Sequence, residues 1–256
     1  MLVASWNVNS IRARLERALA WLDLQQPDVV CMQETKVTDD KFPVEAFADK
    51  GYEVAFWGQK TYNGVALLSR SPLTDIQRGF DNASDEEARL LAATVQGVRV
   101  YSCYVPNGKV IGSPSSEAKL VWLQQLGKLL DRHTSSDPFA VCGDFNIAWD
   151  DRDVHDTAFW RTQVLYHPSM QTALQELAAS RLVDTFRMHH QDAGAYPWWD
   201  YRLLGFPKNK GLRIDYVFAS EALATKCGDA FIDRNERKGK LPSDHAPVLA
   251  RFDLQV

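Results

Sequence analysis

The sequence predicts one domain that mixes α-helices and β-strands. Short apolar runs typical of strands alternate with longer segments whose apolar residues recur at helical spacing. The tight-turn pair Gln96-Gly97 separates two of the strand-like runs, which indicates that some neighbouring strands are antiparallel. The chain has no internal repeat, low-complexity tract or Gly/Ser/Pro-rich linker, so we expect residues 1–256 to form a single domain.

The elements expected in the N-terminal half begin with an apolar, strand-like run over 2–6. Apolar residues then recur at helical spacing from Ile11 to Leu22, until Pro27 ends the helix. The run Val29-Val30-Cys31-Met32 predicts the next strand, over 28–33. Further strands are expected over 64–69, 91–95 and 98–104, the last two as a hairpin.

In the C-terminal half, Ser115-Ser116-Glu117 has the character of a helix start and precedes leucines at positions 120, 123, 126 and 130. A strand is expected over 139–142 and a shorter helix over 174–179. Two apolar runs, over 212–218 and 248–254, predict the last strands.

Composition and charge exclude several classes of protein. A content of 45% hydrophobic and 24% charged residues excludes disordered, collagen-like and coiled-coil chains. The net charge of −4 counts weakly against a protein that coats nucleic acid through a basic surface. Residues 144–156 alone sum to −4, however, and residues 197–215 sum to +2. The negative charge is therefore a property of one segment.

The four cysteines lie far apart and show no paired spacing: Cys31, Cys103, Cys142 and Cys227. We interpret them as buried thiols rather than zinc ligands or disulfide halves. The N-terminus has no signal-peptide pattern, and no run approaches the ~20 apolar residues of a membrane span. We expect a cytoplasmic protein without membrane association and infer no obligate protein partner.

Polar residues repeatedly terminate the apolar runs. They are Asn7, Gln33-Glu34, Tyr104, Asp144 with Asn146, and Asp244-His245 before the last strand. Any one of them alone is ordinary turn chemistry. Together they are typical of sheet-based enzymes, in which strand-end loops converge on one cleft. Glu34 stands out, because a carboxylate after a buried strand must be solvated, paired or metal-bound.

The segment Gly143-Asp144-Phe145-Asn146 places the Asp144 and Asn146 side chains on one face if the chain stays extended. A carboxylate can orient and deprotonate water, and an amide beside it can donate to a phosphoryl oxygen. This pair suits hydrolysis at phosphorus.

A partner for His245 is expected elsewhere than at Asp244, since adjacent side chains on an extended segment point in opposite directions. Asp215 lies inside an apolar strand and needs a nearby partner, which a histidine supplies. The alternative is a salt bridge from Asp215 to Arg213.

Seven motifs occur in the order seen in the exonuclease III family of DNA-repair nucleases, which the chain resembles from residue 3 to about residue 253. They are Ser5-Trp6-Asn7-Val8-Asn9, Gln33-Glu34-Thr35-Lys36, Gly64-Val65-Ala66-Leu67-Leu68-Ser69, Tyr104-Val105-Pro106-Asn107-Gly108, Gly143-Asp144-Phe145-Asn146-Ile147-Ala148, Gly211-Leu212-Arg213-Ile214-Asp215-Tyr216 and Ser243-Asp244-His245-Ala246-Pro247. The resemblance implies an α/β (α+β) fold, the four-layer αββα sandwich of that family, with two face-to-face sheets and strand-end loops that form the active site.

The resemblance also implies a metal group. Glu34 would bind a divalent ion, Mg²⁺ with Mn²⁺ as a substitute, while Asn7 orients groups beside it and Asp244 is a further metal ligand. A hard cation prefers such carboxylate and amide oxygens.

The catalytic group implied by the resemblance surrounds the scissile phosphate. Asp144 would activate the attacking water, with Asn146 as its hydrogen-bonding neighbour. Tyr104 would contact the phosphate or the leaving oxygen. His245, held by Asp215, would stabilise the charge that builds on phosphorus.

The implied substrate is duplex DNA with damaged or recessed 3′ ends. Abasic sites are a further possible substrate. Aromatic residues from Tyr196 to Tyr201 are interleaved with Arg202 and followed by further cations, which suits contact with bases and phosphates. By resemblance, Trp198, Leu212 and Ile214 wall the pocket for the damaged nucleotide. Candidate phosphate contacts are Arg12, Arg14, Lys36, Lys60 and Lys109. Any one of these cations, taken alone, is an ordinary surface charge.

The sequence departs from the family pattern over 164–171, where His167 replaces a small residue and a Glu-Arg pair is absent. One interpretation is a surface loop before a helix. Our hypothesis is that His167 crowds the space of an extrahelical abasic deoxyribose, while a frayed 3′ end still reaches the metal. This would favour 3′→5′ exonuclease and 3′-end-cleaning phosphodiesterase activity over abasic-site (AP) endonuclease activity.

Three alternatives compete with this assignment. One is a dominant AP endonuclease of the same family. Another is a phosphoinositide or lipid phosphohydrolase of the wider superfamily, which the Trp198 loop disfavours. The last is a non-catalytic DNA-binding module. The sequence counts against it, because every position to which the resemblance assigns chemistry carries a residue that can perform it.

Overall fold

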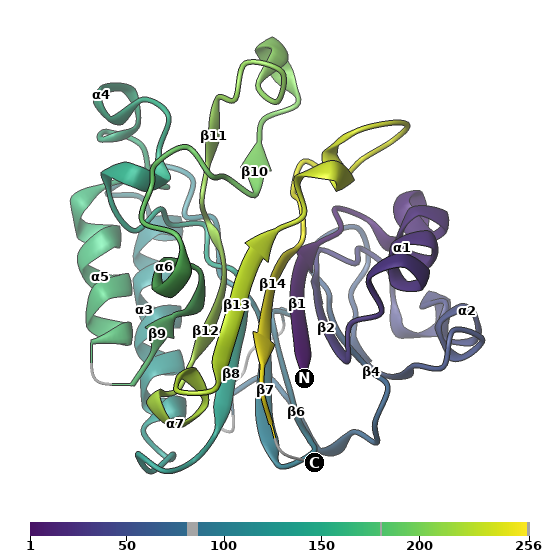
Figure 1. Ribbon diagram of the computed structural model, residues 1–256. Helices are drawn as coiled ribbons and strands as arrows, with labels where there is room; N and C mark the ends of the chain where they lie inside the picture. The colour runs from purple at the N-terminus through teal and green to yellow at the C-terminus, as the bar shows by residue number, and fades with distance from the viewer. Residues whose placement is uncertain (81–86, 180, 255–256) are drawn as a thin grey trace.

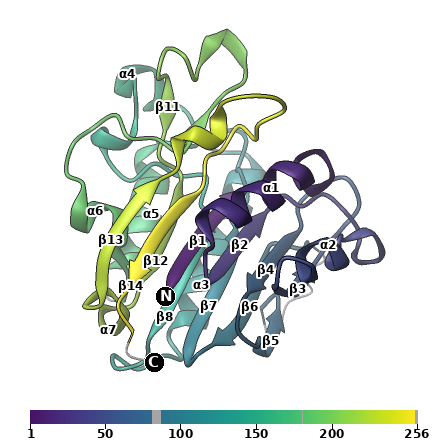
Figure 2. The same cartoon turned by 45° about the vertical axis from the view of Figure 1, so that its right-hand side comes forward.

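The structure, a computed structural model, describes residues 1–80, 87–179 and 181–254. Its strands form two six-stranded sheets that pack face to face, and helices cover the outer face of each sheet (Figure 1, Figure 2). Apolar side chains fill the three interfaces between these layers. The four-layer αββα sandwich that the sequence implies is therefore confirmed.

The first sheet carries the N-terminal strand near its centre. Its spatial order is β13 (Cys227–Ile232), β14 (Val248–Phe252), β1 (Leu2–Asn7), β2 (Val29–Gln33), β4 (Val65–Ser69) and β3 (Glu53–Trp57). β1 is parallel to β2 and antiparallel to β14. The carboxyl ends of β1 and β2 therefore reach the same edge of the sheet.

The second sheet has the order β5 (Thr74–Arg78), β6 (Leu90–Val95), β7 (Val98–Tyr104), β8 (Phe139–Asp144), β12 (Asp215–Ala219) and β9 (Val183–Asp184). β7 is parallel to β8, with Tyr104 opposite Asp144. β8 is antiparallel to β12, with Asp144 opposite Asp215. This register places three of the expected site residues in one row.

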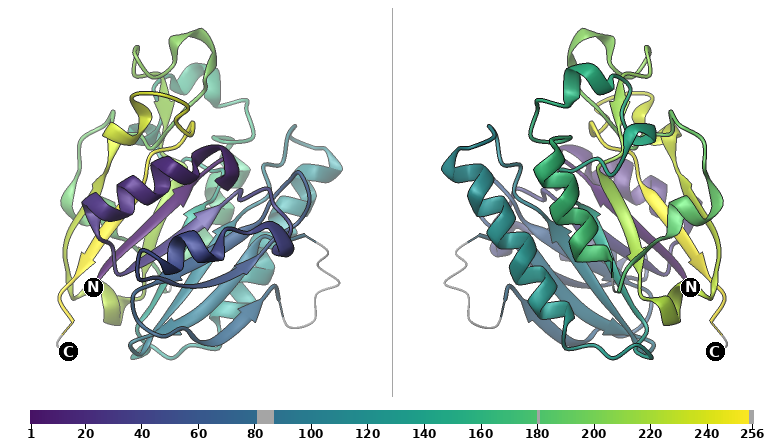
Figure 3. Two further views of the ribbon diagram at one scale, coloured as in Figure 1. Left: turned by 90° about the vertical axis from the view of Figure 1, so that its right-hand side faces the viewer. Right: turned by 90° about the vertical axis from the view of Figure 1, so that its left-hand side faces the viewer.

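Helices form the two outer layers. α1 (Ile11–Gln25) and α2 (Val44–Ala48) lie against the first sheet, and α3 (Pro114–Leu130) and α5 (Pro168–Ala178) lie against the second, as the two views of Figure 3 show. The shorter helices are α4 (Thr157–Trp160), α6 (Thr185–His189) and α7 (Glu221–Ala224). Within the described residues, no helix has the length and apolar character needed to cross a membrane.

A separate two-stranded ribbon, β10 (Trp198–Trp199) paired with β11 (Gly211–Leu212), rises above the strand ends (Figure 1). An isolated bridge joins Trp198 to His245. The ribbon is thereby fixed over the edge of the sandwich where Asn7, Tyr104 and Asp144 end their strands.

The predicted elements occur, with instructive differences at their ends. The hairpin is confirmed: Gln96 and Gly97 both adopt positive φ, at 49° and 80°, which a two-residue hairpin turn requires. The helix expected at Ser115 begins at Pro114, because the Ser113 side chain accepts a hydrogen bond from Ser116 N and caps it. The helix expected over 174–179 begins earlier, at Pro168, with His167 as its N-cap.

Two other expectations were wrong in part. The strand expected over 212–218 is broken at Arg213 and Ile214, because Arg213 N donates to the carbonyl of Asp153 instead of continuing the ladder of the sheet. Three cysteines are buried free thiols, but Cys227 is only half-buried, and its Sγ lies 3.5 Å from His189 Nε2.

Candidate active site

Strand ends from both sheets meet at one edge of the sandwich (Figure 1), and hydrogen bonds join the polar side chains that they carry. Asn7 ends β1 and Glu34 follows β2, while Tyr104 ends β7 and Asp144 ends β8. Asp215 lies opposite Asp144 at the start of β12. Because β1 with β2 and β7 with β8 are parallel pairs, their carboxyl ends deliver these groups to the same place.

The amide of Asn7 joins the two sheets. Its Nδ2 donates to Glu34 Oε1 at 2.8 Å and to Asp144 Oδ2 at 2.9 Å. Asn7 is fully buried, so these hydrogen bonds are shielded from water. One amide thus fixes two carboxylates that lie on different sheets.

His245 is paired with Asp215, as the sequence indicated. Nδ1 of His245 lies 2.8 Å from Asp215 Oδ2, and its Nε2 lies 3.7 Å from Asp144 Oδ2. Burial alone lowers the pKa of His245, but the carboxylates of Asp215 and Asp144 outweigh it and raise the pKa to about 10. The imidazole is therefore a buried cation at neutral pH.

Asp144 occupies the centre of the site. Burial, followed by repulsion from Asp215, raises the pKa of Asp144 to about 7, although His245 acts in the opposite direction. Burial also raises the pKa of Asp215, against the opposing effect of His245. A carboxyl group with a pKa near neutrality is suited to accept a proton from water.

Glu34 has charged and aromatic neighbours. Its Oε2 lies 2.7 Å from Lys36 Nζ. The Tyr104 hydroxyl is buried close to Glu34 and Asp144, and burial followed by these negative charges raises its pKa well above the usual value. Tyr104 is therefore a neutral hydrogen-bond donor under any physiological condition.

The donor set fits a divalent cation. Glu34, Asp144 and His245 each bring one potential ligand atom, and the three atoms lie within 4.8 Å of one another. Since His245 is protonated, the two carboxylates are the groups available to an ion. Carboxylate oxygens are the ligands that Mg²⁺ and Mn²⁺ prefer.

Asp244 is bound by a different set of donors and does not belong to the group of Glu34, Asp144 and His245. Its Oδ1 accepts from Asn9 Nδ2 at 2.8 Å and its Oδ2 accepts from Trp198 Nε1 at 3.1 Å. Asn9, which has no role in the sequence analysis, also accepts from Lys36 Nζ at 2.6 Å. The structure therefore does not bring Asp244 together with Glu34 and Asp144.

Asn146 lies beside Asp144, but not on an extended strand. β8 ends at Asp144, and Asn146 adopts a left-handed conformation with φ of 53°. Its backbone N–H donates to Asp144 Oδ1 at 2.9 Å, and its Nδ2 donates to Val105 O at 3.0 Å. The alternation expected over Asp144 and Asn146 is wrong, because this turn replaces it.

Comparison with known proteins agrees with this geometry. Residues 4–245 match the model of the endonuclease/exonuclease/phosphatase family. The chain belongs to this family.

Three of its relatives span nearly the whole chain. Exodeoxyribonuclease III of Haemophilus influenzae is 36% identical over 97% of this chain and 98% of its own length. An AP endonuclease from Archaeoglobus fulgidus superimposes with a TM-score of 0.97 at 37% identity, covering 99% of this chain and all of its own. The 3′ phosphatase NExo from Neisseria, solved with a product DNA hairpin, gives a TM-score of 0.96 at 38% identity, with 99% and 100% coverage. The resemblance to the exonuclease III family is therefore confirmed.

In this family member, the residues expected to form a nucleotide pocket are mostly covered. Leu212 and Ile214 are buried, and Leu212 pairs with Trp198 in the ribbon. Trp198 is half-buried, whereas Trp199 belongs to the core. Among these side chains, Trp198 is therefore the one with a partly exposed ring, and it lies beside His245.

The expected phosphate-binding cations divide into three groups. Arg12, Lys36 and Lys60, together with Lys41, line one cavity of about 350 Å³, and Lys36 links it to Glu34 through their ion pair. Arg14 instead donates to backbone and tyrosine oxygens within the protein. Lys109 and Arg202 are exposed, and Arg202 forms an ion pair with Asp200 at 2.6 Å.

His167 has a structural role that the sequence analysis missed. Its Nδ1 accepts from Ser169 N at 3.3 Å and lies 2.8 Å from Ser169 Oγ, so the ring caps α5. Proline at the first helical position, Pro168, was the sequence signal for this helix start.

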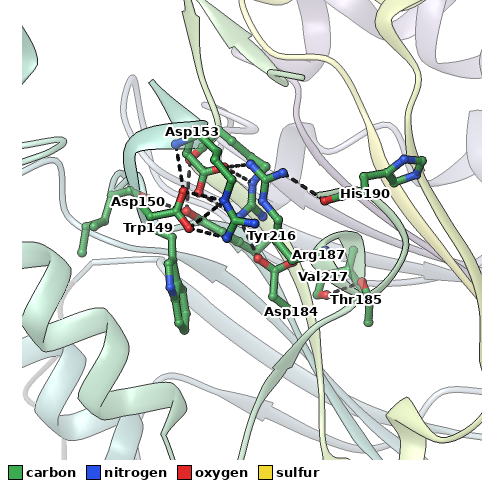
Figure 4. Close-up of polar contacts among 12 residues, drawn as sticks. Trp149, Asp150, Asp153, Asp184, Thr185, Arg187, His190, Tyr216 and Val217 are labelled. Carbon is green, nitrogen blue, oxygen red and sulfur yellow. Dashed lines mark hydrogen bonds and ion pairs between the residues drawn. The ribbon is translucent and has the colours of Figure 1, made fainter. Parts of the chain in front are cut away.

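Within the acidic segment over 144–156, Asp153 is neutralised inside the protein. Asp153 is fully buried and accepts from Arg213 Nε at 2.7 Å and from Arg187, while Arg213 also pairs with Asp184 at 2.7 Å. Figure 4 shows Asp153, Asp184 and Arg187 gathered at this point. Arg213 therefore does not pair with Asp215, and its side chain anchors the turn between Leu212 and Ile214.

Proposed function

We propose that this protein is a Mg²⁺-dependent DNA nuclease that acts as a 3′→5′ exonuclease and 3′-end-cleaning phosphodiesterase, with Mn²⁺ as a substitute ion. The observation that carries the proposal is the junction at Asn7. Two carboxylates, one from each sheet, meet there beside a histidine that is held as a cation. This is the set of groups that hydrolysis at phosphorus requires.

In the proposed mechanism, Glu34 would hold the ion, and Asn7 orients both Glu34 and the adjacent Asp144. The ion, when bound, offsets negative charge on the phosphate. Asp144 accepts the proton of the attacking water, because its pKa of about 7 matches this task. His245 donates to a phosphoryl oxygen from the side opposite Asp215.

Tyr104 is proposed to donate a hydrogen bond to the leaving oxygen. Its hydroxyl stays protonated, since burial and Glu34 raise its pKa. It lies in register with Asp144 across the parallel pair β7 and β8. A neutral donor at this position can hydrogen-bond to the scissile phosphate or to the oxygen that departs. Asp244 as a metal ligand stays a prediction, since its two oxygens accept hydrogen bonds from Asn9 and Trp198 in this structure.

DNA as the substrate is supported by the surroundings of the site and by the relatives. Four cations line the cavity that Lys36 links to Glu34, and the β10–β11 ribbon stands over the strand ends. The relatives are an exodeoxyribonuclease, an AP endonuclease and a 3′ phosphatase bound to a DNA hairpin. We propose damaged or recessed 3′ ends as the preferred substrates, and abasic-site incision as the weaker activity because of His167.

The test offers the Mg²⁺-supplied enzyme two labelled duplexes in parallel. One contains an internal abasic analogue, and the other ends in a recessed 3′ terminus or a 3′ phosphate. We expect the 3′ end to be processed faster. Cleavage of neither duplex would rule out the DNA-repair assignment, and faster incision at the abasic analogue would favour the AP endonuclease alternative.

A further inference from the structure

Lys119 is a buried lysine behind the active site. It lies near the start of α3 and is fully buried, and its Nζ donates to the carbonyl oxygens of Asn146 at 2.6 Å and Asn107 at 3.0 Å. Within the described residues, no carboxylate lies within ion-pair distance of Lys119. Its ammonium group is thus devoted to two backbone carbonyls of the strand-end loops.

The loop around Lys119 is shaped to admit the side chain. Gly108 adopts a φ of 87°, and a Cβ at this position would lie 3.0 Å from Lys119 Cδ and 2.8 Å from Val164 Cγ2. Any larger residue would have to displace Val164 and would crowd the lysine stem. The glycine therefore makes room for the lysine in the same loop whose Asn107 carbonyl the lysine binds.

A short chain of hydrogen bonds connects Lys119 to Asp144. Lys119 binds the carbonyl of Asn146, and the N–H of Asn146 donates to Asp144 Oδ1 at 2.9 Å. Asn107 Nδ2 donates to Asn146 Oδ1 at 3.1 Å. Asn146 holds a left-handed conformation, which asparagine adopts more readily than most residues, and the contacts from Lys119 and Asn107 fix its carbonyl and its side chain in that turn.

We propose that Lys119 is a positioning residue for phosphodiester hydrolysis. It holds Asn146 in the conformation that fixes Asp144 Oδ1, so that Asp144 Oδ2 stays between Asn7 and His245. The inference rests on the role proposed above for Asp144.

The cost of burying Lys119 supports a role beyond packing. Burial lowers the pKa of Lys119 to about 7, against the attraction of Asp144. A methionine would fill the same volume without this desolvation cost. An amine retained at this position is explained by the two carbonyls that it binds.

The experiment compares Lys119→Met with Lys128→Met, the same substitution at an exposed position of α3. Single-turnover and steady-state rates are measured on a 3′-recessed duplex with Mg²⁺. We expect Lys119→Met to lower kcat by about 100-fold with KM nearly unchanged, because a small misplacement of a catalytic group has this effect. Lys128→Met should behave as the wild type.

A merely structural effect is separated by Leu126→Val, which removes one buried methylene from the same helix. If Leu126→Val lowers Tm as much as Lys119→Met and lowers kcat as much, the positioning role is wrong. If Lys119→Met does not fold, the same rates are measured on Lys119→Gln, which keeps a shorter hydrogen-bond donor. A reduced kcat at unchanged KM in Lys119→Gln supports the positioning role, and an unchanged kcat overturns it.

The same assay on Asp144→Asn distinguishes a failure of the inference about Lys119 from a failure of the proposed function. Loss of activity in Asp144→Asn with full activity in Lys119→Met refutes only the role of Lys119. Full activity in Asp144→Asn refutes the proposed mechanism itself.

Discussion

The side-chain amide of Asn7 donates a hydrogen bond of 2.9 Å to Oδ2 of Asp144, and this contact links the two sheets at the edge where their strands end. The contact is buried and the same amide also holds Glu34. The relative position of the two carboxylates is therefore set by one side chain from the first strand of the protein.

Replacing Asn7 by alanine should lower kcat on a 3′-recessed duplex by about 10- to 100-fold, the usual effect of losing a residue that orients metal-binding groups. Removal of the amide leaves Glu34 and Asp144 without their shared donor. Ser5→Ala, in the same buried strand, is the matched control and should retain activity, since Ser5 bonds to Gln33 instead. Equal loss in both variants would assign the effect to the strand as a whole.

Replacing Asp215 by asparagine should move the alkaline limit of activity to lower pH. Asp215 and Asp144 raise the pKa of His245 to about 10, so the variant should lose the active imidazolium at a lower pH. The measurement is a pH profile of kcat. The stability of the wild type should depend on pH in the same direction. Because the fold raises the pKa of His245, the protonated imidazole stabilises the wild type fully below the ordinary histidine pKa, and this contribution disappears as pH rises toward 10. An unchanged profile would exclude a catalytic role for the His245 cation.

Replacing Asp153 by asparagine should destabilise the protein by about 3–5 kcal/mol, because Arg213 and Arg187 would lose a buried partner. Asp150→Asn breaks a more exposed ion pair with Arg152 and should cost about 0–1 kcal/mol. Urea unfolding measures both. Similar values for the two variants would mean that the buried network does not fix the turn at Arg213.

Replacing His167 by serine should raise cleavage at an internal abasic analogue relative to removal of a 3′ nucleotide. Serine is itself a good N-cap, so α5 should keep its start while the bulky ring is removed. The ratio of the two rates on matched duplexes is the measurement. A ratio that does not rise contradicts the steric hypothesis.

Much of the fold and the centre of the site could be predicted because their signals are local. Apolar runs marked β1, β2, β7 and β8, and the residues that end them mark the site. The pairing of Asp215 with His245 followed from the cost of a charge inside an apolar strand. Strands β3, β5 and β13 were missed, since their exposed edge positions interrupt the apolar pattern.

The remaining features depend on contacts between distant segments. Arg213 pairs with Asp153, 60 residues away, and no spacing rule reveals such a partner. Lys119 did leave a signal: it lies four residues before Leu123 and seven before Leu126, on the buried face of α3. A lysine on an apolar helix face predicts a buried amine, but the carbonyls that it binds become visible only in the structure.

Release of nucleotides from a 3′-labelled, 3′-recessed duplex, measured for the wild type and for Asp144→Asn with Mg²⁺ and after EDTA, tests the central claim most directly. We predict that the wild type degrades the 3′ end only with the metal, and that Asp144→Asn loses at least about 1,000-fold in rate. Wild-type activity that survives EDTA, or an Asp144→Asn variant that keeps its activity, would contradict the account.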